Sequence, residues 1–185
     1  MIKVAIALGI LVSAAVLMKK KDMSYRQSIL KSIYPMIMWS TNSNGKRQLL
    51  ENKNGATPSM SFYDLTMNAI DGTPFNFSNL KGKKILIVNT ASDCGYTGQY
   101  EALEKLQQQY KEQLVVIGFP ANDFKGQEKS DNQNIAAFCK KNYGVSFPLM
   151  EKSIVIQKNQ QNLVHKWLSD PSLNGWCNQE PVWNF

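Results

Sequence analysis

Residues 84–119 read KILIVNTASDCGYTGQYEALEKLQQQYKEQLVVIGF. Lys84–Thr90 and Leu114–Phe119 are nearly continuous apolar runs, the pattern of parallel strands that are buried on both faces. Between them, Gly98–Gln113 carries apolar residues at helical spacing, which predicts an amphipathic helix. A strand, a helix and a second strand in this order predict an α/β layer architecture with parallel pairing.

The flanking sequence extends this pattern in both directions. Phe62–Phe77 predicts two short strands around an Asp71-Gly72 turn. Further along the chain we expect a helix over Asn132–Tyr143, a short strand over Ser153–Ile156 and a helix over Leu163–Leu168. Together these elements predict a single α/β domain with its own core.

The charges are distributed unevenly between the two parts of the chain. The formal net charge is +7, and residues 1–58 account for all of it with nine Lys or Arg against two acidic residues. Residues 59–185 carry 12 Lys, no Arg and 12 acidic residues, so the expected domain is neutral. A basic segment confined to the N-terminus favours a membrane surface and argues against nucleic-acid binding.

Residues 1–22 are expected to form a membrane anchor or a signal segment. Val4–Met18 is an apolar and small-residue run followed directly by Lys19-Lys20-Lys21, and it is short for a full span. An uncleaved anchor would leave the domain facing the cytoplasm, because more positive charge follows the run than precedes it. A signal peptide cleaved near Ser13-Ala14-Ala15 would export the domain instead. A hydrophobic tail without a membrane role is the third alternative.

Residues 23–58 are expected to be a basic juxtamembrane segment and linker. Tyr25–Trp39 has helical spacing with basic residues among the apolar ones, which is typical of an interfacial helix, and Pro35 is expected to break it. The alternative is an extra helix packed on the domain. Thr41–Ser59, rich in Asn, Gly and Ser, reads as a linker.

Cys94 lies between the first apolar run and the predicted helix. Free amides and a helix dipole there would lower the pKa of its thiol and favour the reactive thiolate. Thr97 stands where a dithiol oxidoreductase would carry a second cysteine, so the corner suits a single attacking thiol, and a buried inert cysteine is the alternative. With three cysteines and His165 as the only histidine, a zinc site is hard to assemble, and His165 is expected at the surface or in packing.

Four strings resemble the glutathione-peroxidase family in sequence and in order: NTASDCGYTGQY (Asn89–Tyr100), GFPANDFKGQEKSDNQNI (Gly118–Ile135), NYGVSFPLMEK (Asn142–Lys152) and WNF (Trp183–Phe185). The resemblance implies a thioredoxin-like fold, with a central mixed sheet flanked by helices in residues 59–185. It also implies a peroxidatic residue at Cys94. Because the family usually continues beyond WNF with further strands and a helix, the chain is expected to be a fragment or to close its core differently.

The active-site tetrad that the resemblance implies falls on Cys94, Gln127, Trp183 and Asn184. A neutral amide and an indole N–H can hydrogen-bond a thiolate without neutralising it. They can also stabilise charge that moves onto a departing oxygen. Asn122 matches a family position near the pocket and is expected to give structural support.

The resolving step is where the sequence departs from the family. Lys140 and Ala121 stand at the positions where family branches carry a resolving cysteine. Cys139 lies on the apolar face of its predicted helix, which favours packing, whereas Cys177 lies in a Gly- and Asn-rich stretch that could move. Both remain possible resolving residues, with Cys177 preferred.

The function implied is a thiol peroxidase acting in oxidative stress on hydrogen peroxide or on organic hydroperoxides, including those of lipids. Thioredoxin or glutathione would serve as the reducing co-substrate, with no prosthetic cofactor and no metal. Glutathione carries two carboxylates, and a domain without Arg favours thioredoxin. The alternative is a thioredoxin-like redox sensor or binding module without efficient turnover.

Overall fold

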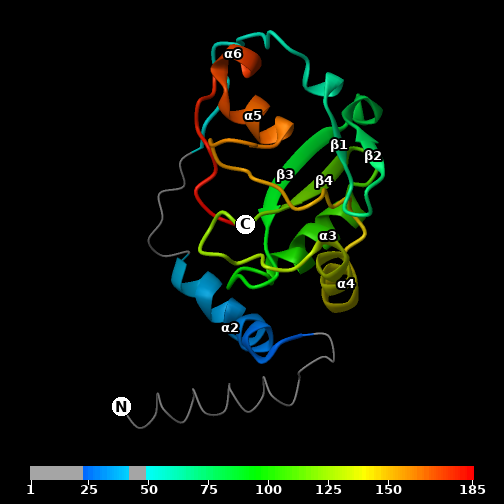
Figure 1. Ribbon diagram of the computed structural model, residues 1–185, viewed down its shortest axis with the longest axis vertical. Helices are drawn as coiled ribbons and strands as arrows, with labels where there is room; N and C mark the ends of the chain where they lie inside the picture. Colours follow the sequence, from blue (N-terminus) through cyan, green and yellow to red (C-terminus); the bar gives the residue numbers. More distant parts are fainter. Residues whose placement is uncertain (1–22, 42–48) are drawn as a thin grey trace.

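The computed structural model describes residues 23–41 and 49–185 (Figure 1). The predicted anchor at Val4–Met18 lies outside them. The elements, in chain order, are α2 (Tyr25–Thr41), a 3-10 turn η1 (Phe62–Asp64), β1 (Thr66–Asn68), β2 (Pro74–Asn76), a 3-10 turn η2 (Phe77–Leu80), β3 (Lys84–Thr90), α3 (Gln99–Gln109), β4 (Leu114–Pro120), α4 (Asn132–Tyr143), α5 (Leu163–Ser169) and α6 (Pro171–Asn174).

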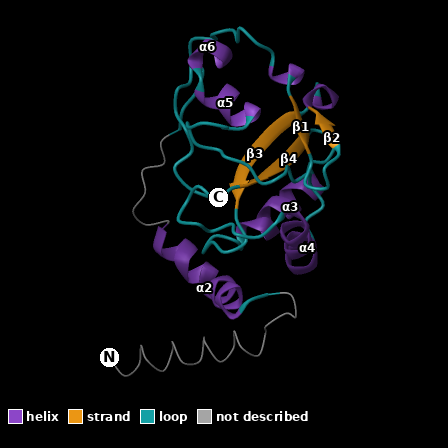
Figure 2. Cartoon of the chain, in the orientation of Figure 1, coloured by secondary structure: helices purple, strands orange, loops and turns teal. Residues whose placement is uncertain are grey.

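The centre of the domain is the parallel pair of β3 and β4. Its register runs from Lys84 opposite Leu114 to Thr90 opposite Pro120, as the two apolar runs predicted. Because side chains alternate across a strand, those of the β3–β4 pair pack into two separate cores, one on each face. On one face Ile85, Ile87, Val115, Ile117 and Phe119 pack with residues of α5, and on the other Leu86, Val88 and Val116 pack with residues of α3 and α4. Figure 2 shows these helices on either side of the strands.

The predicted mixed sheet is present only in part. The hairpin of β1 and β2 is antiparallel, and its turn includes Gly72 with a φ of 84°, as the Asp71-Gly72 signal predicted. Single bridges link it to the centre: Met150 pairs antiparallel with Ala69, while Leu149 pairs parallel with Gly118. The continuous sheet in the described residues is therefore the β3–β4 pair, and only single parallel and antiparallel bridges extend it.

Two sequence predictions of local structure need correction. Ser153–Ile156 is not a strand, because only Ile154 makes a bridge there, to Gln161. β3 was expected to be buried on both faces, yet most of it is half-buried. Its Ile85 and Ile87 line an open pocket, so one face of this strand is not fully covered.

The helices predicted over 132–143 and 163–168 are present as α4 and α5, and side-chain caps begin both of them. Asp131 caps α4 by accepting a hydrogen bond from the Asn134 amide at 2.8 Å, and Gly144 ends it with a φ of 67°. Asn162 caps α5 in the same way through the His165 amide, at 2.9 Å. The helix predicted over 98–113 is shorter, since α3 ends at Gln109.

The N-terminal helix α2 continues through Pro35, so the predicted break is wrong. Proline removes one intrahelical hydrogen bond, but tertiary contacts hold the preceding turns. Met23 and Ser28 are buried, and Arg26 and Lys31 form ion pairs with residues of the domain. The expected alternative of a helix packed on the domain therefore describes α2.

None of the helices in the described part of the chain is long and apolar enough to cross a membrane.

Candidate active site

The loop after β3 is tied to two other segments of the chain. The Ala121 amide donates to the Thr90 carbonyl at 2.9 Å, and the Asp93 amide donates to the Gln127 carbonyl at 3.1 Å. Ser92 donates from both its amide and its hydroxyl to the buried carboxylate of Glu128, at 2.7 and 2.8 Å. These bonds fix the part of the loop that leads up to Cys94.

Cys94 is fully buried, and three N–H groups that face its sulfur lower the pKa of its thiol. They are the backbone amide of Tyr96, the indole of Trp183 and the side-chain amide of Gln127. All three donors are neutral, so they stabilise a thiolate without forming an ion pair with it.

Asn184 connects Gln127 to the fold. It is fully buried and donates to the Gln127 Oε1 at 3.2 Å and to the Ala121 carbonyl at 3.3 Å. Because the Gln127 oxygen accepts from Asn184, its NH₂ group is left to face the sulfur. The structure thus brings the four predicted residues of the tetrad together, and Asn184 acts on Cys94 through the orientation of Gln127.

The last residues of the chain enter the site along β3. The Phe185 amide donates to the Asn89 carbonyl at 2.9 Å, and the Phe185 ring meets Tyr100 edge-on at 5.0 Å. The Trp183 and Phe124 ring centroids lie 6.1 Å apart. The Lys125 ammonium lies 5.0 Å from the centroid of the Trp183 ring. These contacts hold the half-buried indole against the loop that carries Gln127.

The pKa of the Cys94 thiol is raised above its ordinary value, contrary to the sequence-based expectation. Burial is the largest cause, because it disfavours the charged thiolate. The hydrogen bonds from Tyr96, Trp183 and Gln127 lower the pKa, and the nearby Asp93 carboxylate raises it. α3 begins only at Gln99, so its N-terminus is not at the thiol.

The sequence model of the family described as "Glutathione peroxidase" matches residues 62–169. The chain belongs to the glutathione peroxidase family. The matched part contains Cys94 and Gln127, whereas Trp183 and Asn184 lie beyond it.

Curated relatives agree with this membership. A glutathione peroxidase-like peroxiredoxin of Chlamydomonas reinhardtii is 48% identical over 125 residues, which cover 67% of this chain and 76% of that protein. Another from Schizosaccharomyces pombe is 55% identical over 92 residues, covering 49% of this chain and 58% of that protein. The chain thus spans less than two thirds of the second relative.

A solved structure supports the same fold. The crystal structure described as Trgpx in apo form is 33% identical to the chain and has a TM-score of 0.50, covering 69% of this chain and 75% of its own. The α/β domain is therefore thioredoxin-like, as the resemblance to the glutathione peroxidase family implied.

The other two cysteines lie in different surroundings, and all three are free. Cys139 is fully buried on α4, as its place on the apolar helix face predicted, and burial raises the pKa of its thiol to about 12.

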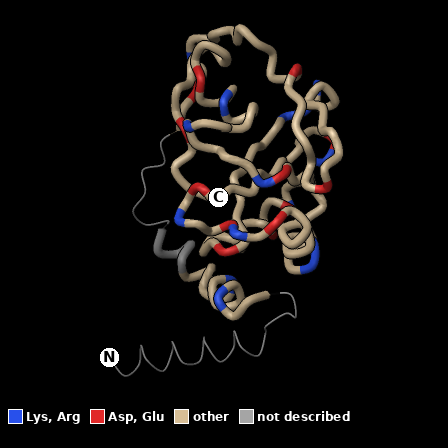
Figure 3. Tube along the Cα trace, viewed as in Figure 1, with Lys and Arg blue, Asp and Glu red and all other residues tan. Residues whose placement is uncertain are grey.

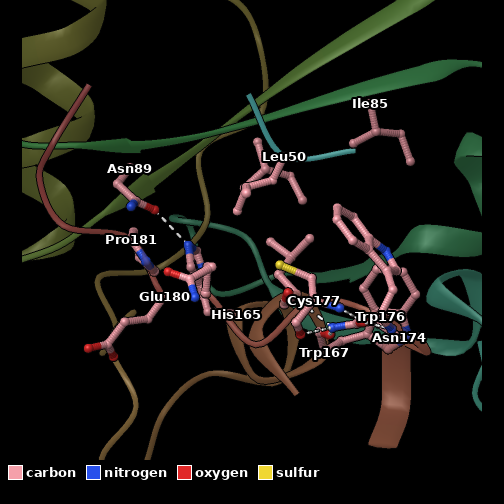
Figure 4. Close-up of a pocket in the computed structure, with 13 residues that line it drawn as sticks. Leu50, Ile85, Asn89, His165, Trp167, Asn174, Trp176, Cys177, Glu180 and Pro181 are labelled. Atoms are coloured by element: carbon pink, nitrogen blue, oxygen red, sulfur yellow. Dashed lines mark hydrogen bonds between the residues drawn. The ribbon is translucent and has the colours of Figure 1, made fainter. Parts of the chain in front are cut away.

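Cys177 is half-buried and lines a pocket of about 490 Å³ with Ile85 and Ile87 (Figure 4). Its loop is held by the buried Asn174, which accepts from the Cys177 amide and donates to its carbonyl, both at 2.7 Å. The mobility expected of this Gly- and Asn-rich stretch therefore has no support in its hydrogen bonds.

His165 is a buried packing residue that lies between two amide side chains. Its Nε2 is 2.6 Å from the Asn89 Oδ1 and its Nδ1 is 3.1 Å from the Asn162 Oδ1. Burial lowers the pKa of His165 to about 4, so its ring is neutral at neutral pH. Within residues 23–36 and 49–185, no three His, Cys, Asp or Glu side chains are grouped so that they could hold a metal ion.

Two polar residues of the site were not singled out from the sequence. Glu128 and Ser92 form the buried contact that holds the Cys94 loop. In the sequence, a Glu next to Gln127 and a Ser two residues before Cys94 do not by themselves indicate a functional role. Asn122 was expected to give structural support, and its Oδ1 accepts from the Glu128 amide at 2.9 Å. Ser92 and Glu128 both lie inside the strings that resemble the family, and this was the signal available.

Proposed function

We propose that this member of the glutathione peroxidase family reduces hydroperoxides with Cys94 as the attacking residue. The observation that carries the proposal is the set of three neutral N–H donors around the Cys94 sulfur. Burial alone would favour the neutral thiol, so donors at this point stabilise the one form of the sulfur that attacks an O–O bond.

The first step oxidises Cys94 and reduces the peroxide by two electrons. The thiolate sulfur attacks one peroxide oxygen, an S–O bond forms and the O–O bond breaks, and the electron pair of that bond leaves with the other oxygen. This oxygen departs as hydroxide or alkoxide and takes a proton from solvent, giving water or an alcohol. The Trp183 and Gln127 N–H groups can stabilise the developing negative charge.

The second step returns the sulfenic acid to a thiol. An attacking thiol forms a disulfide with Cys94 and releases water, and a second thiol then releases Cys94 and leaves the donor as a disulfide. We favour a dithiol protein such as thioredoxin over glutathione as the donor, because residues 59–185 contain no Arg to hold the glutathione carboxylates. Cys177 is the better internal resolving candidate, because the buried Cys139 thiol has a pKa of about 12.

The assignment of Cys94 is tested by single-turnover oxidation with hydrogen peroxide. Cys94→Ser should abolish sulfenic acid formation, while Cys139→Ser, the matched change at the other buried thiol, should retain it. Peptide mapping of peroxide-treated protein should give a Cys94–Cys177 disulfide or a sulfenic acid open to an external thiol. Fast sulfenic acid formation in Cys94→Ser would refute the assignment.

A redox sensor that oxidises without efficient turnover is the second candidate. The complete burial of Cys94 favours this alternative, because it hinders the approach of a bulky reductant. Steady-state peroxide consumption with thioredoxin, and separately with glutathione, decides between them. Repeated turnover with either reductant excludes the sensor, and a single oxidation without turnover supports it.

We further propose that the N-terminal segment attaches the protein to a membrane with the domain facing the cytoplasm, which makes lipid hydroperoxides available as substrates. The support is the apolar run of Val4–Met18 and the basic residues that follow it. The full chain should remain with membranes through a high-salt wash, because salt does not screen apolar burial. A variant lacking residues 2–18, which keeps α2, should be released. Release of the full chain by salt alone would contradict the attachment.

A further inference from the structure

Helix α2 contacts the segment around Cys94 on both sides of the cysteine. Before it, the Arg26 Nη1 lies 2.6 Å from the Asp93 Oδ2. After it, the Tyr34 ring lies so close to Gly98 that a Cβ at this position would overlap with the ring. Figure 3 shows basic positions on α2 beside acidic positions of the domain. An element outside the matched family region is thus in direct contact with the reactive loop.

Asp93 is the charged residue closest in sequence to the reactive sulfur. Its carboxylate raises the pKa of Cys94, and among the described residues its Oδ1 is buried without a hydrogen-bond partner. Arg26 is therefore the group that offsets this charge, through the other carboxylate oxygen. An unpaired Asp93 would oppose formation of the neighbouring thiolate more strongly.

The other charges near the loop are already engaged. Glu128 accepts hydrogen bonds from Ser92, and Lys125 lies over the Trp183 ring. Glu101, on the first turn of α3, pairs with Lys31 of α2 at 2.9 Å. None of these three charges forms an ion pair with Asp93.

We propose that Arg26 is a positioning residue for the reaction of Cys94: it holds the Asp93 carboxylate on α2 and offsets its charge, which favours the thiolate. The inference rests on the proposed role of Cys94 and adds a residue from the N-terminal extension to it. The effect is moderate, because the Arg26 and Asp93 side chains are 65% and 24% exposed and water screens the pair.

Lys31 provides a matched control on the same helix. Its ammonium pairs with Glu101, donates to the Asn142 carbonyl at 3.3 Å and lies 4.3 Å from the centre of the Tyr143 ring. Lys31→Gln therefore removes an ion pair that docks α2 without touching Asp93. Arg26→Gln leaves the Lys31 contacts, the Tyr34 contact and the buried Met23 in place.

The experiment measures the rate of Cys94 alkylation by iodoacetamide against pH in the full-length protein, resolved by peptide mass spectrometry. Arg26→Gln should shift the profile to higher pH and slow the reaction at neutral pH by about two- to fivefold, the size typical of exposed ion pairs. Asp93→Asn should abolish this sensitivity, so that Arg26→Gln in that background changes nothing further. The difference between wild type and Arg26→Gln should also shrink at high salt.

Three results would overturn the proposal: an unchanged profile in Arg26→Gln, an equal shift in Lys31→Gln, or the same shift when Asp93 is already Asn. An unchanged profile would show that Arg26 has no electrostatic effect on Cys94. Either of the other two results would show that Arg26 only helps to dock α2 on the domain. Alkylation reports the thiol itself, so its outcome is independent of peroxide turnover. A chain whose Cys94 follows these predictions but forms no sulfenic acid would disprove the peroxidase function and leave the role of Arg26 intact.

Discussion

Cys94 and Cys139 are both fully buried, and burial raises the pKa of both thiols. Their partners differ. Three N–H donors oppose burial at Cys94, whereas the Tyr100 side chain alone does so at Cys139, where the pKa reaches about 12. If Cys94 is the reactive residue that we propose, burial does not distinguish it from Cys139, and the N–H groups facing its sulfur do.

The backbone explains why the two sites differ. Cys139 lies inside α4, where the amides donate to carbonyls of the preceding turn and none remains for a side chain. Cys94 lies in a loop between β3 and α3, so the Tyr96 amide can donate to the sulfur. Segments distant in sequence add Gln127 and Trp183. A strand-to-helix loop thus supplies donors that a helix interior cannot.

The largest difference is expected in alkylation of the wild-type protein. At mildly alkaline pH, a thiol with a pKa near 12 is thiolate in only about one molecule in 10⁴, so Cys139 should be practically inert. Cys94 should react much faster, because three N–H groups oppose the effect of burial at its sulfur. Peptide-resolved mass spectrometry after iodoacetamide treatment measures both rates in one sample. Comparable rates would show that the donors around Cys94 do not set its reactivity.

The sequence was informative wherever one segment carries its own signal. The apolar runs over 84–90 and 114–119 predicted the parallel pair, and helical spacing predicted α4 over Asn132–Tyr143. Family motifs pointed to the tetrad, including the WNF string that lies beyond the matched region. In each case the deciding residues are close together in the chain or belong to one motif.

The sequence failed where the outcome depends on segments far apart in the chain. The Cys94 pKa was expected to fall because of local amides, but burial by the assembled fold dominates. The contact of Glu128 with Ser92 joins residues 36 positions apart. Pro35 indicated a helix break, yet contacts of α2 with the domain override it. Such effects require the three-dimensional arrangement and leave no local signal.

The next effect tests the support of the Cys94 loop. Glu128→Gln replaces a buried carboxylate that accepts from the Ser92 amide, the Ser92 hydroxyl and the Ser130 amide. The new NH₂ group leaves at least one of these donors without an acceptor. We expect a loss of about 1–3 kcal/mol in the free energy of unfolding, together with slower oxidation of Cys94.

Glu104→Gln is the matched control on the Cys139 side. Glu104 accepts from the Ser146 amide and hydroxyl at 2.8 and 2.7 Å, the same pattern as at Glu128, but this contact is exposed. Water can satisfy the donors there, so we expect a loss below about 1 kcal/mol and unchanged Cys94 oxidation. Urea unfolding and single-turnover oxidation measure both properties. Equal losses in the two variants would mean that Glu128 has no special role at the loop.

The last effect concerns a single donor. Trp183→Phe keeps an aromatic ring against Phe124 but removes the indole N–H that lowers the pKa of Cys94. The pKa should therefore rise, and because less thiolate is present below the pKa, peroxide oxidation at neutral pH should slow by roughly tenfold. Tyr100→Phe removes the corresponding group at Cys139 and should leave Cys94 oxidation unchanged. Stopped-flow oxidation against pH distinguishes two causes of slower oxidation in Trp183→Phe.

A loss of rate that disappears at high pH indicates that less thiolate is present, whereas a loss of rate that persists at every pH indicates weaker stabilisation of the departing oxygen. An unchanged rate in Trp183→Phe would remove Trp183 from the donors that distinguish Cys94 from Cys139.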